Sequence, residues 1–195
     1  MLRSVGPFGQ TAAASSDKCL GRERSNAMAQ LLLLRGAMGA GKSTVAGLLR
    51  ELLPETVFIE VDDIKLTIHG APSKCDPETV FREAGVQAKN AMDAGNDAIV
   101  IEPLCTREHI RFVLNEAGIP DDMSQVPSVW LDCTLKTALQ RKRRKFSDAI
   151  IKSQHQRYAT RYKLVGEVVI ETDELSAPDV AQQVLRHVRH HRPAC

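Results

Sequence analysis

A nine-residue segment, 36–44, carries the clearest chemical signal in this sequence. It reads GAMGAGKST and matches GxxxxGK[ST], a pattern typical of loops that bind the phosphate groups of nucleotides. Its glycines leave backbone N–H groups open to phosphate oxygens and allow backbone angles that strain other residues. The predicted nucleotide-binding residues are therefore Gly36, Ala37, Met38, Gly39, Ala40, Gly41, Lys42, Ser43 and Thr44.

Two side chains of this loop suit phosphoryl chemistry. Lys42 comes at the expected start of a helix, where its ammonium group and the helix N-terminus both favour the outer phosphates of a triphosphate. Ser43 places a hydroxyl group where Mg²⁺ would bind. The loop thus predicts ATP and Mg²⁺ as cofactors, with Lys42 as a catalytic residue and Ser43 as a metal ligand. The alternative is a structural turn that contains Gly-Lys-Ser by chance.

Besides a phosphate-binding loop and a metal ion, phosphoryl transfer needs a group that orients or deprotonates the acceptor. A pair of aspartates could supply this group. Asp62 follows a short apolar run, and a carboxylate there could accept a hydroxyl proton or bind a metal-bound water. We predict Asp62 as a catalytic residue and metal ligand. Asp63 could share or exchange this role, or contact the substrate. Alternatively, the two aspartates only cap the short helix expected after them.

Phosphoryl transfer also needs positive charge over the phosphoryl group that moves. Five consecutive basic residues, 141–145, could supply this charge. They follow an expected helix, at the entry to a predicted lid around 141–155. Arg141 and Arg144 lie three residues apart and can face the same way. Guanidinium groups match phosphate oxygens in pairs, so both arginines are predicted to be catalytic. The alternative is a solvated basic helix end, which the helix dipole favours by itself.

Two more residues are weaker candidates for the acceptor site. Glu102 ends an expected strand directly before a proline and could hold the substrate or touch a metal through water, or be only a boundary residue. Arg107 lies on the first turn of the next expected helix. It could bind an acidic acceptor or lie on a solvated face.

Short apolar runs alternate with stretches of helical periodicity, which predicts a parallel sheet covered by helices on both faces. In such sheets ligands bind outside the carboxyl ends of the strands. This rule places the phosphate loop, Asp62 and Glu102 on one edge. The expected strands are 31–34, 57–61, 97–101, 128–131 and 167–171, and the expected helices are 42–53, 64–69, 76–95, 106–117, 135–145, 148–163 and 178–190.

Length and composition favour one folded domain. With 195 residues, 43% of them hydrophobic, the chain can bury one sizeable core. Residues 1–28 lack periodicity and are predicted to be a disordered leader or extension, with a single domain at 29–195. An organelle-targeting segment is the other interpretation of the leader.

The net charge and the cysteine content indicate which binding partners and which cellular compartment to expect. The net charge of +2 is accounted for by residues 1–28, so the body is neutral, which disfavours a long nucleic-acid partner. No apolar run is long enough to cross a membrane. Five cysteines without CxxC spacing do not suit a disulfide framework, and a cytoplasmic protein is expected.

With these residues assembled, the chain resembles the P-loop small kinases of nucleoside-monophosphate-kinase topology, a group that includes polynucleotide kinases, chloramphenicol phosphotransferase and adenylylsulfate kinase. The resemblance covers nearly all of 30–190 and depends on segments 36–44, 61–65, 130–135, 141–145 and 170–173. It implies a five-stranded P-loop nucleoside triphosphate hydrolase fold, with three layers and strand order 2-3-1-4-5. It also implies that Asp62 is the acceptor-activating base and that Arg141 and Arg144 reach the phosphates. Polynucleotide kinases commonly have Arg where Lys65 stands.

The preferred function is therefore transfer of the γ-phosphate of ATP to a hydroxyl or phosphate of a small molecule or nucleotide. The alternative is a nucleotide-dependent ATPase or switch protein. Adjacent acidic residues after an apolar strand are typical of motor ATPases, and this chain has only Glu102 at such a position. An NKxD motif is typical of GTPases, and the sequence lacks it. Neither the acceptor nor the oligomeric state follows from the sequence.

Overall fold

The computed structural model describes residues 29–70, 76–120, 126–141 and 146–190 of the chain. The predicted leader, 1–28, lies outside them, as does Arg144. The strands are β1 (Leu31–Gly36), β2 (Val57–Glu60), β3 (Ala98–Ile101), β4 (Ser128–Asp132) and β5 (Val168–Glu171). The helices are α1 (Lys42–Leu52), α2 (Val61–His69), α3 (Pro77–Asp93), α4 (Arg107–Glu116), α5 (Leu135–Arg141), α6 (Asp148–Ala159) and α7 (Ala177–His190).

The five strands form one parallel sheet in the order β2-β3-β1-β4-β5. This order confirms the predicted 2-3-1-4-5 arrangement. The β1 strand lies in the centre and is buried on both faces, which explains its four consecutive leucines. Because neighbouring side chains of a strand alternate in direction, Leu32 and Leu34 pack into one half of the core, and Leu31 and Leu33 pack into the other.

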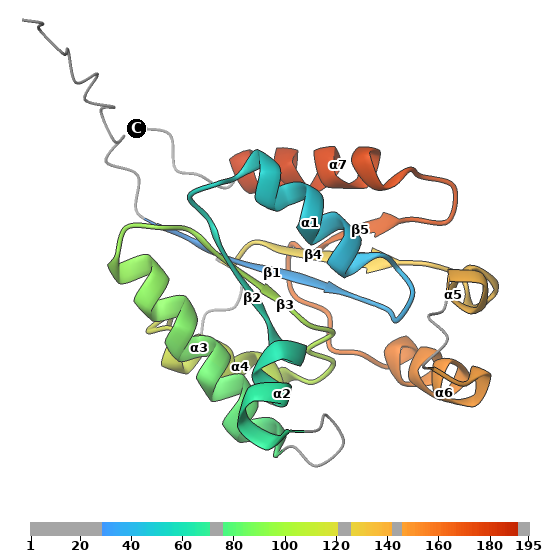
Figure 1. Cartoon of the computed structure of the whole chain (residues 1–195), viewed down its shortest axis with the longest axis horizontal. Coiled ribbons are helices and arrows are strands. Elements are labelled where there is room, and N and C mark those ends of the chain that lie inside the picture. The colour runs from blue at the N-terminus through green and yellow to red at the C-terminus, as the bar shows by residue number, and fades with distance from the viewer. Residues whose placement is uncertain (1–28, 71–75, 121–125, 142–145, 191–195) are drawn as a thin grey trace, which may run out of the picture.

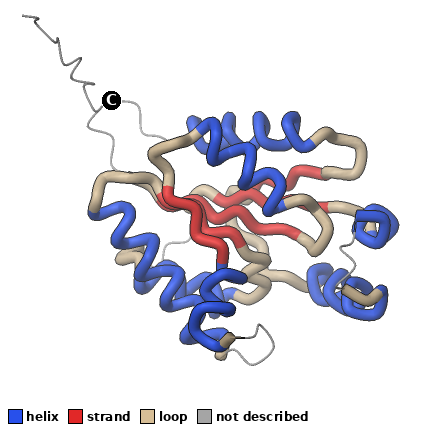
Figure 2. Tube along the Cα trace, in the orientation of Figure 1, coloured by secondary structure: helices blue, strands red, loops and turns tan. Residues whose placement is uncertain are grey.

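Helices cover both faces of the sheet, as Figure 1 and Figure 2 show. One layer contains α1 and α7, and the opposite layer contains α2, α3 and α4. The α3 and α4 helices approach closely at Gly85, where an added Cβ would lie 2.4 Å from the carbonyl oxygen of Val113. The α5 and α6 helices lie beyond the carboxyl ends of β1 and β4, next to the edge where a ligand site is expected.

One boundary differs from the expectation in a way that matters for the site. The strand expected at 57–61 ends at Glu60, and α2 begins at Val61. Asp62 and Asp63 therefore lie in the first turn of a helix, where their negative charge suits the N-terminal end of the helix dipole. Glu60, on the edge strand β2, pairs with Arg50 at 2.8 Å.

Candidate active site

The phosphate-loop segment forms a turn between β1 and α1 that depends on its glycines. Gly39 has φ of +85° and Gly41 has φ of +95°. Residues with a Cβ atom rarely adopt such positive φ values. A Cβ atom on Gly39 would also lie 2.8 Å from the Cα atom of Ala138 in α5. Two elements far apart in the sequence thus meet closely at this turn, and only glycine allows the approach.

Lys42 is the first residue of α1, and its ammonium group lies over the loop. The Nζ atom donates hydrogen bonds to the carbonyl oxygens of Gly36, at 2.9 Å, and Ala37, at 3.1 Å. Burial lowers the pKa of Lys42, and the carboxylates of Glu102 and Asp62 act against this shift. The charged form of a buried amine becomes favourable when an anion is nearby. Polyphosphate would supply such an anion at this position.

A cluster of charges connects the loop with the ends of β2 and β3. Lys65 Nζ donates to Asp62 Oδ1 and to Glu102 Oε1, both at 2.9 Å. Burial acts to lower the pKa of Lys65, but the attraction of Glu102 and the hydrogen bond to Asp62 raise it overall. Burial raises the pKa of Glu102, although Lys65 acts in the opposite direction. The Asp62 side chain is 76% exposed, so it is open to a substrate.

These groups line one cleft of about 730 Å³, a volume typical of small-molecule sites. Phosphate-loop residues form one part of its wall, and side chains from α2, α3, the turn after β3, α4, α5 and α6 form most of the rest. The residues that line the cleft include Gly39, Gly41, Lys42, Ser43, Thr44, Asp62, Lys65, Phe81, Glu102, Cys105, His109, Arg141, Gln154, Arg157 and Tyr158.

The structure brings most of the predicted site residues together. Asp62, Glu102 and Arg141 share the cleft with Lys42 and the loop hydroxyls. Arg141 ends α5 and donates to the hydroxyl and the carbonyl oxygen of Thr172 at 3.1 and 2.7 Å. Its guanidinium group is thus fixed between α5 and the end of β5, at the side of the cleft.

Other predicted residues lie elsewhere. Asp63 and Arg107 are exposed and are not among the residues that line the cleft in the described chain. Arg144 and the remainder of the basic run at 142–145 lie outside the described residues. Roles for these three residues stay predictions.

Several cleft residues were not predicted from the sequence. Lys65 follows Asp62 by three positions, so helical spacing alone could have indicated their contact. His109 and Arg157 gave no such signal, because they come from α4 and α6 and line the same cleft only in the folded chain. The α6 helix also contacts the phosphate loop directly, since His155 Nε2 lies 3.1 Å from the carbonyl oxygen of Met38.

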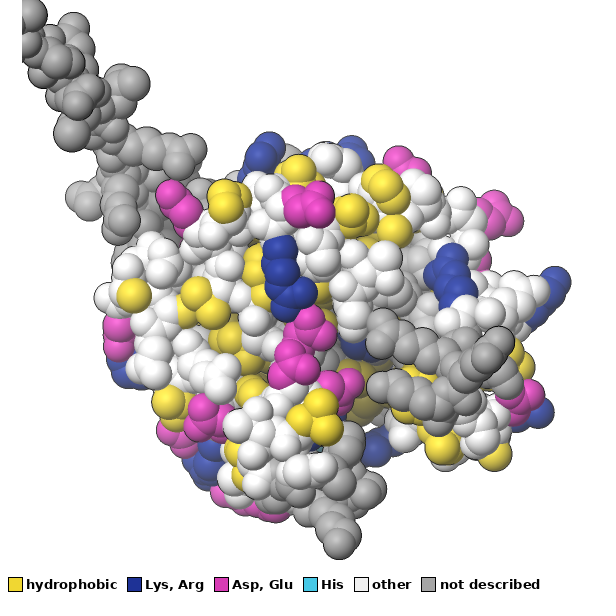
Figure 3. All heavy atoms as spheres, viewed as in Figure 1, with side chains coloured by type: hydrophobic (Ala, Val, Ile, Leu, Met, Phe, Trp, Pro, Cys, Tyr) yellow, Lys and Arg dark blue, Asp and Glu magenta, His cyan; other side chains and the backbone are white. Residues whose placement is uncertain are grey.

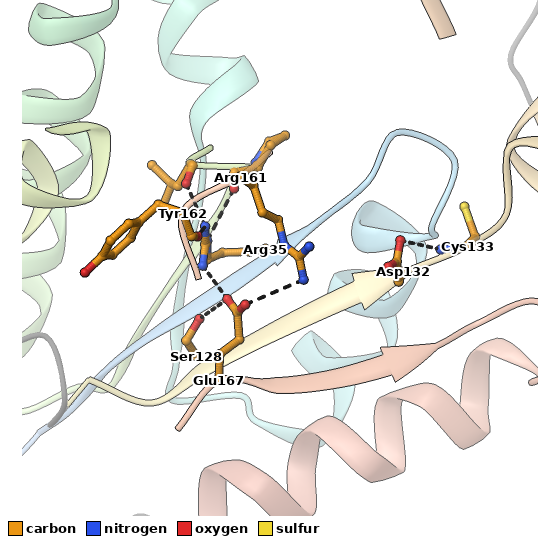
Figure 4. A network of polar contacts seen from close by, with 9 residues as sticks. Arg35, Ser128, Asp132, Cys133, Arg161, Tyr162 and Glu167 are labelled. Carbon is orange, nitrogen blue, oxygen red and sulfur yellow. Dashed lines mark hydrogen bonds and ion pairs between the residues drawn. The ribbon is translucent and has the colours of Figure 1, made fainter. Parts of the chain in front are cut away.

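A buried ion pair lies directly behind the loop (Figure 4). Arg35, the residue before Gly36, pairs with Glu167, and their side chains are 0% and 3% exposed. Arg35 also donates to the carbonyl oxygens of Pro103, Leu104 and Tyr162, at 3.3, 2.8 and 2.7 Å. It therefore joins three segments, namely the end of β1, the turn after β3 and the chain after α6.

The backbone of Leu104 indicates that the turn after β3 is tightly constrained. Among the described residues, Leu104 is the one non-glycine residue with a left-handed backbone, at φ of +45°. This conformation persists only where surrounding contacts enforce it. Its carbonyl oxygen accepts a hydrogen bond from Arg35. Because Glu102 and Cys105 flank this turn and line the cleft, Arg35 helps to shape the cleft wall.

Charge on the outer surface is mixed. Figure 3 shows basic and acidic side chains interspersed over the described part of one face, without a large area of a single sign. This distribution agrees with the neutral body expected from the sequence. In the described residues no helix is long and apolar enough to cross a membrane.

Comparison with solved structures defines the class of fold. APS kinase of Mycobacterium tuberculosis, in complex with AMPPNP and APS, matches with a TM-score of 0.62 and 19% identity, over 84% of this chain and 99% of that chain. A sugar kinase of Janibacter sp. HTCC2649 matches with a TM-score of 0.61 and 18% identity, over 83% and 95%. Shikimate kinase of Acinetobacter baumannii, in complex with shikimate, matches with a TM-score of 0.52 and 20% identity, over 85% and 96%.

These likenesses, together with the strand order and the loop, show that the chain has the three-layer P-loop fold of the small kinases. A scan of family models and a search of curated proteins found no match to this chain. The structural likeness extends over nearly the whole length of the compared kinases. At 18–20% identity this likeness establishes the fold alone.

Proposed function

We propose that the protein is an ATP-dependent phosphotransferase that acts on a small molecule or a nucleotide. The observation that carries this proposal is that the phosphate loop, Lys42, a carboxylate and an arginine from separate elements all line one cleft. Phosphoryl transfer requires this combination of a phosphate cradle, an acceptor-orienting group and positive charge. The structurally similar kinases support it, because their described complexes hold AMPPNP with APS, or shikimate.

Each residue has a defined part in this mechanism. The loop amides hold the phosphates of ATP, and Lys42 exchanges its two carbonyl partners for the outer phosphates. Ser43 and Asp62 line the same cleft and suit Mg²⁺, which binds through few protein oxygens, water and phosphate. Bound Mg²⁺ would neutralise phosphate charge. Arg141 supplies further positive charge, and Arg144 is proposed to act with it.

The transfer step can be written in full. The acceptor hydroxyl gives its proton to the Asp62 carboxylate, and its oxygen forms a bond to the γ-phosphorus. The bond between that phosphorus and the β,γ-bridging oxygen breaks, and ADP leaves. Lys65, 2.9 Å from both Asp62 and Glu102, orients the two carboxylates. Lys65 is therefore a positioning residue in this proposal, while Glu102 faces the substrate.

The first test is binding of Mg²⁺ with AMP-PNP, measured by calorimetry on wild type, Lys42→Met and Lys136→Met. Lys136 is an exposed residue of α5 that does not line the cleft, so it is the matched control. Wild type and the control should bind alike. In a parallel assay of ATP consumption, Lys42→Met should reduce turnover by about 10²- to 10³-fold, as loss of a transition-state donor does. A folded wild-type protein that does not bind the nucleotide would refute the proposal.

The second test separates a kinase from an ATPase without an acceptor. ATP consumption is measured with hydroxy acids, sugars and nucleoside monophosphates, in wild type and Asp62→Asn. A kinase should consume ATP much faster with one acceptor class, and loss of the general base should slow transfer by about 10²- to 10⁴-fold. Hydrolysis at the same rate with every compound would favour the ATPase.

A further inference from the structure

The cleft has a second half that the nucleotide roles do not use. Beyond the phosphate loop its wall is formed by α3, the turn after β3, α4 and α6. Phe81, which is 4% exposed, and His109 line this half, with ring centroids 4.5 Å apart and planes inclined by 35°. These rings suit the body of an organic acceptor, because aromatic faces pack against rings and carbon chains.

Arg157 brings a positive charge to this half. It lies in the last turn of α6 and lines the cleft with its neighbours Gln154 and Tyr158. Within the described chain its guanidinium group has no hydrogen bond and no ion pair. The other described lysines and arginines of the cleft differ, because Lys42 donates to two carbonyl oxygens of the loop, Lys65 pairs with two carboxylates and Arg141 donates to Thr172.

The neighbours of Arg157 show where its charge acts. Burial lowers the pKa of His109, and the positive charge of Arg157 lowers it further. Burial raises the pKa of Cys105, and Arg157 acts against that shift. Arg157 thus lines the same cleft as Cys105 of the turn after β3 and His109 of α4. Glu102 in the turn after β3 already pairs with Lys65, so Arg157 is the cation of this half that has no ion pair within the described residues.

We infer that the acceptor carries an oxyanion group, which pairs with Arg157, while its body lies against Phe81 and its hydroxyl faces Asp62. This inference depends on the proposed phosphotransferase function and specifies its substrate class. The class comprises hydroxylated molecules with a carboxylate, sulfate or phosphate group. A guanidinium group binds each of these through two parallel hydrogen bonds. Arg157 is then a specificity-determining residue.

The experiment uses simple anions as probes while the nucleotide site is filled. Wild type, Arg157→Gln and Lys152→Gln are each saturated with Mg²⁺ and AMP-PNP and titrated with phosphate, sulfate or acetate at constant ionic strength. Thermal unfolding reports binding, because a bound ligand raises the unfolding temperature in a saturable way. Lys152 is the control, since it is an exposed cation of the same helix that does not line the cleft.

The expected result is saturable stabilisation of wild type and Lys152→Gln by at least one anion, with an affinity at least tenfold weaker in Arg157→Gln. The preferred anion then indicates whether the acceptor carries a carboxylate, a sulfate or a phosphate. Arg157→Lys should restore part of the affinity, because it keeps the charge without the two-pronged geometry.

Three results would overturn the inference. They are equal stabilisation of all three proteins, no saturable stabilisation of wild type by any anion with or without AMP-PNP, and anion binding to wild type in a titration without nucleotide that disappears once AMP-PNP is added. The last result would assign Arg157 to the nucleotide. Failure of AMP-PNP itself to bind wild type would instead refute the phosphotransferase proposal, so the two failures are distinguishable.

Discussion

Replacing Arg35 by methionine tests whether the buried ion pair behind the loop supports the fold. The change leaves Glu167 without its main partner at 3% exposure and removes the donor from three carbonyl oxygens. Removing one partner of a buried pair costs about 3–5 kcal/mol, because the other charge stays buried. Arg161 lies 3.8 Å from Glu167 and compensates in part. We therefore expect the free energy of unfolding to fall by about 3 kcal/mol.

Urea unfolding measures this loss. The single tryptophan, Trp130, lies under two guanidinium groups, with Arg35 at 5.3 Å and Arg161 at 3.9 Å from its ring centroid, so its fluorescence reports on the region. Circular dichroism gives an independent signal. The matched control is Arg50→Met, which breaks an ion pair whose arginine is 43% exposed. Exposed pairs contribute about 0–1 kcal/mol, so this variant should remain close to wild type.

A double variant checks the physical reason. In Arg35→Met with Glu167→Met both charges are gone, so the loss should be smaller than the sum of the two single losses. A loss below about 1 kcal/mol for Arg35→Met, or strictly additive losses, would contradict the argument that an uncompensated buried charge dominates.

Two further predictions concern stability. Gly85→Ala should destabilise the protein by about 1–3 kcal/mol in urea unfolding, because the new methyl group would overpack against the Val113 carbonyl oxygen at 2.4 Å, and an unchanged midpoint would contradict that close approach. Hydrogen bonds from Thr134 and Thr137 lower the pKa of Asp173 below its usual 3.8. Wild type should therefore be more stable than Asp173→Asn at pH 7, with the difference shrinking as the pH falls below about 4, and a difference constant from pH 7 to 3 would refute this assignment.

The nucleotide half of the site was predictable because it is local in sequence. A strand, a glycine turn and a helix follow one another within 31–52, and each leaves its own pattern of apolar residues or glycines. The parallel sheet was predictable for a similar reason, because each strand is a short apolar run and each helix has apolar residues at helical spacing. The strand order came from the resemblance to the small kinases, and the structure confirms it.

The proposed acceptor half was decided largely by tertiary structure, because Asp62 and Glu102 were predicted from the sequence, whereas Phe81, His109 and Arg157 were not. Arg107 and Arg157 are both arginines on exposed helix ends, and nothing in their sequence neighbourhoods separates them. Packing of α4 in the layer with α2 and α3, and of α6 beyond the carboxyl ends of β1 and β4, leaves Arg107 outside and brings Arg157 to the cleft. Local patterns determine which elements form and where a phosphate can bind. Which side chains from distant elements face one another depends on how those elements pack, and a linear pattern does not contain that information.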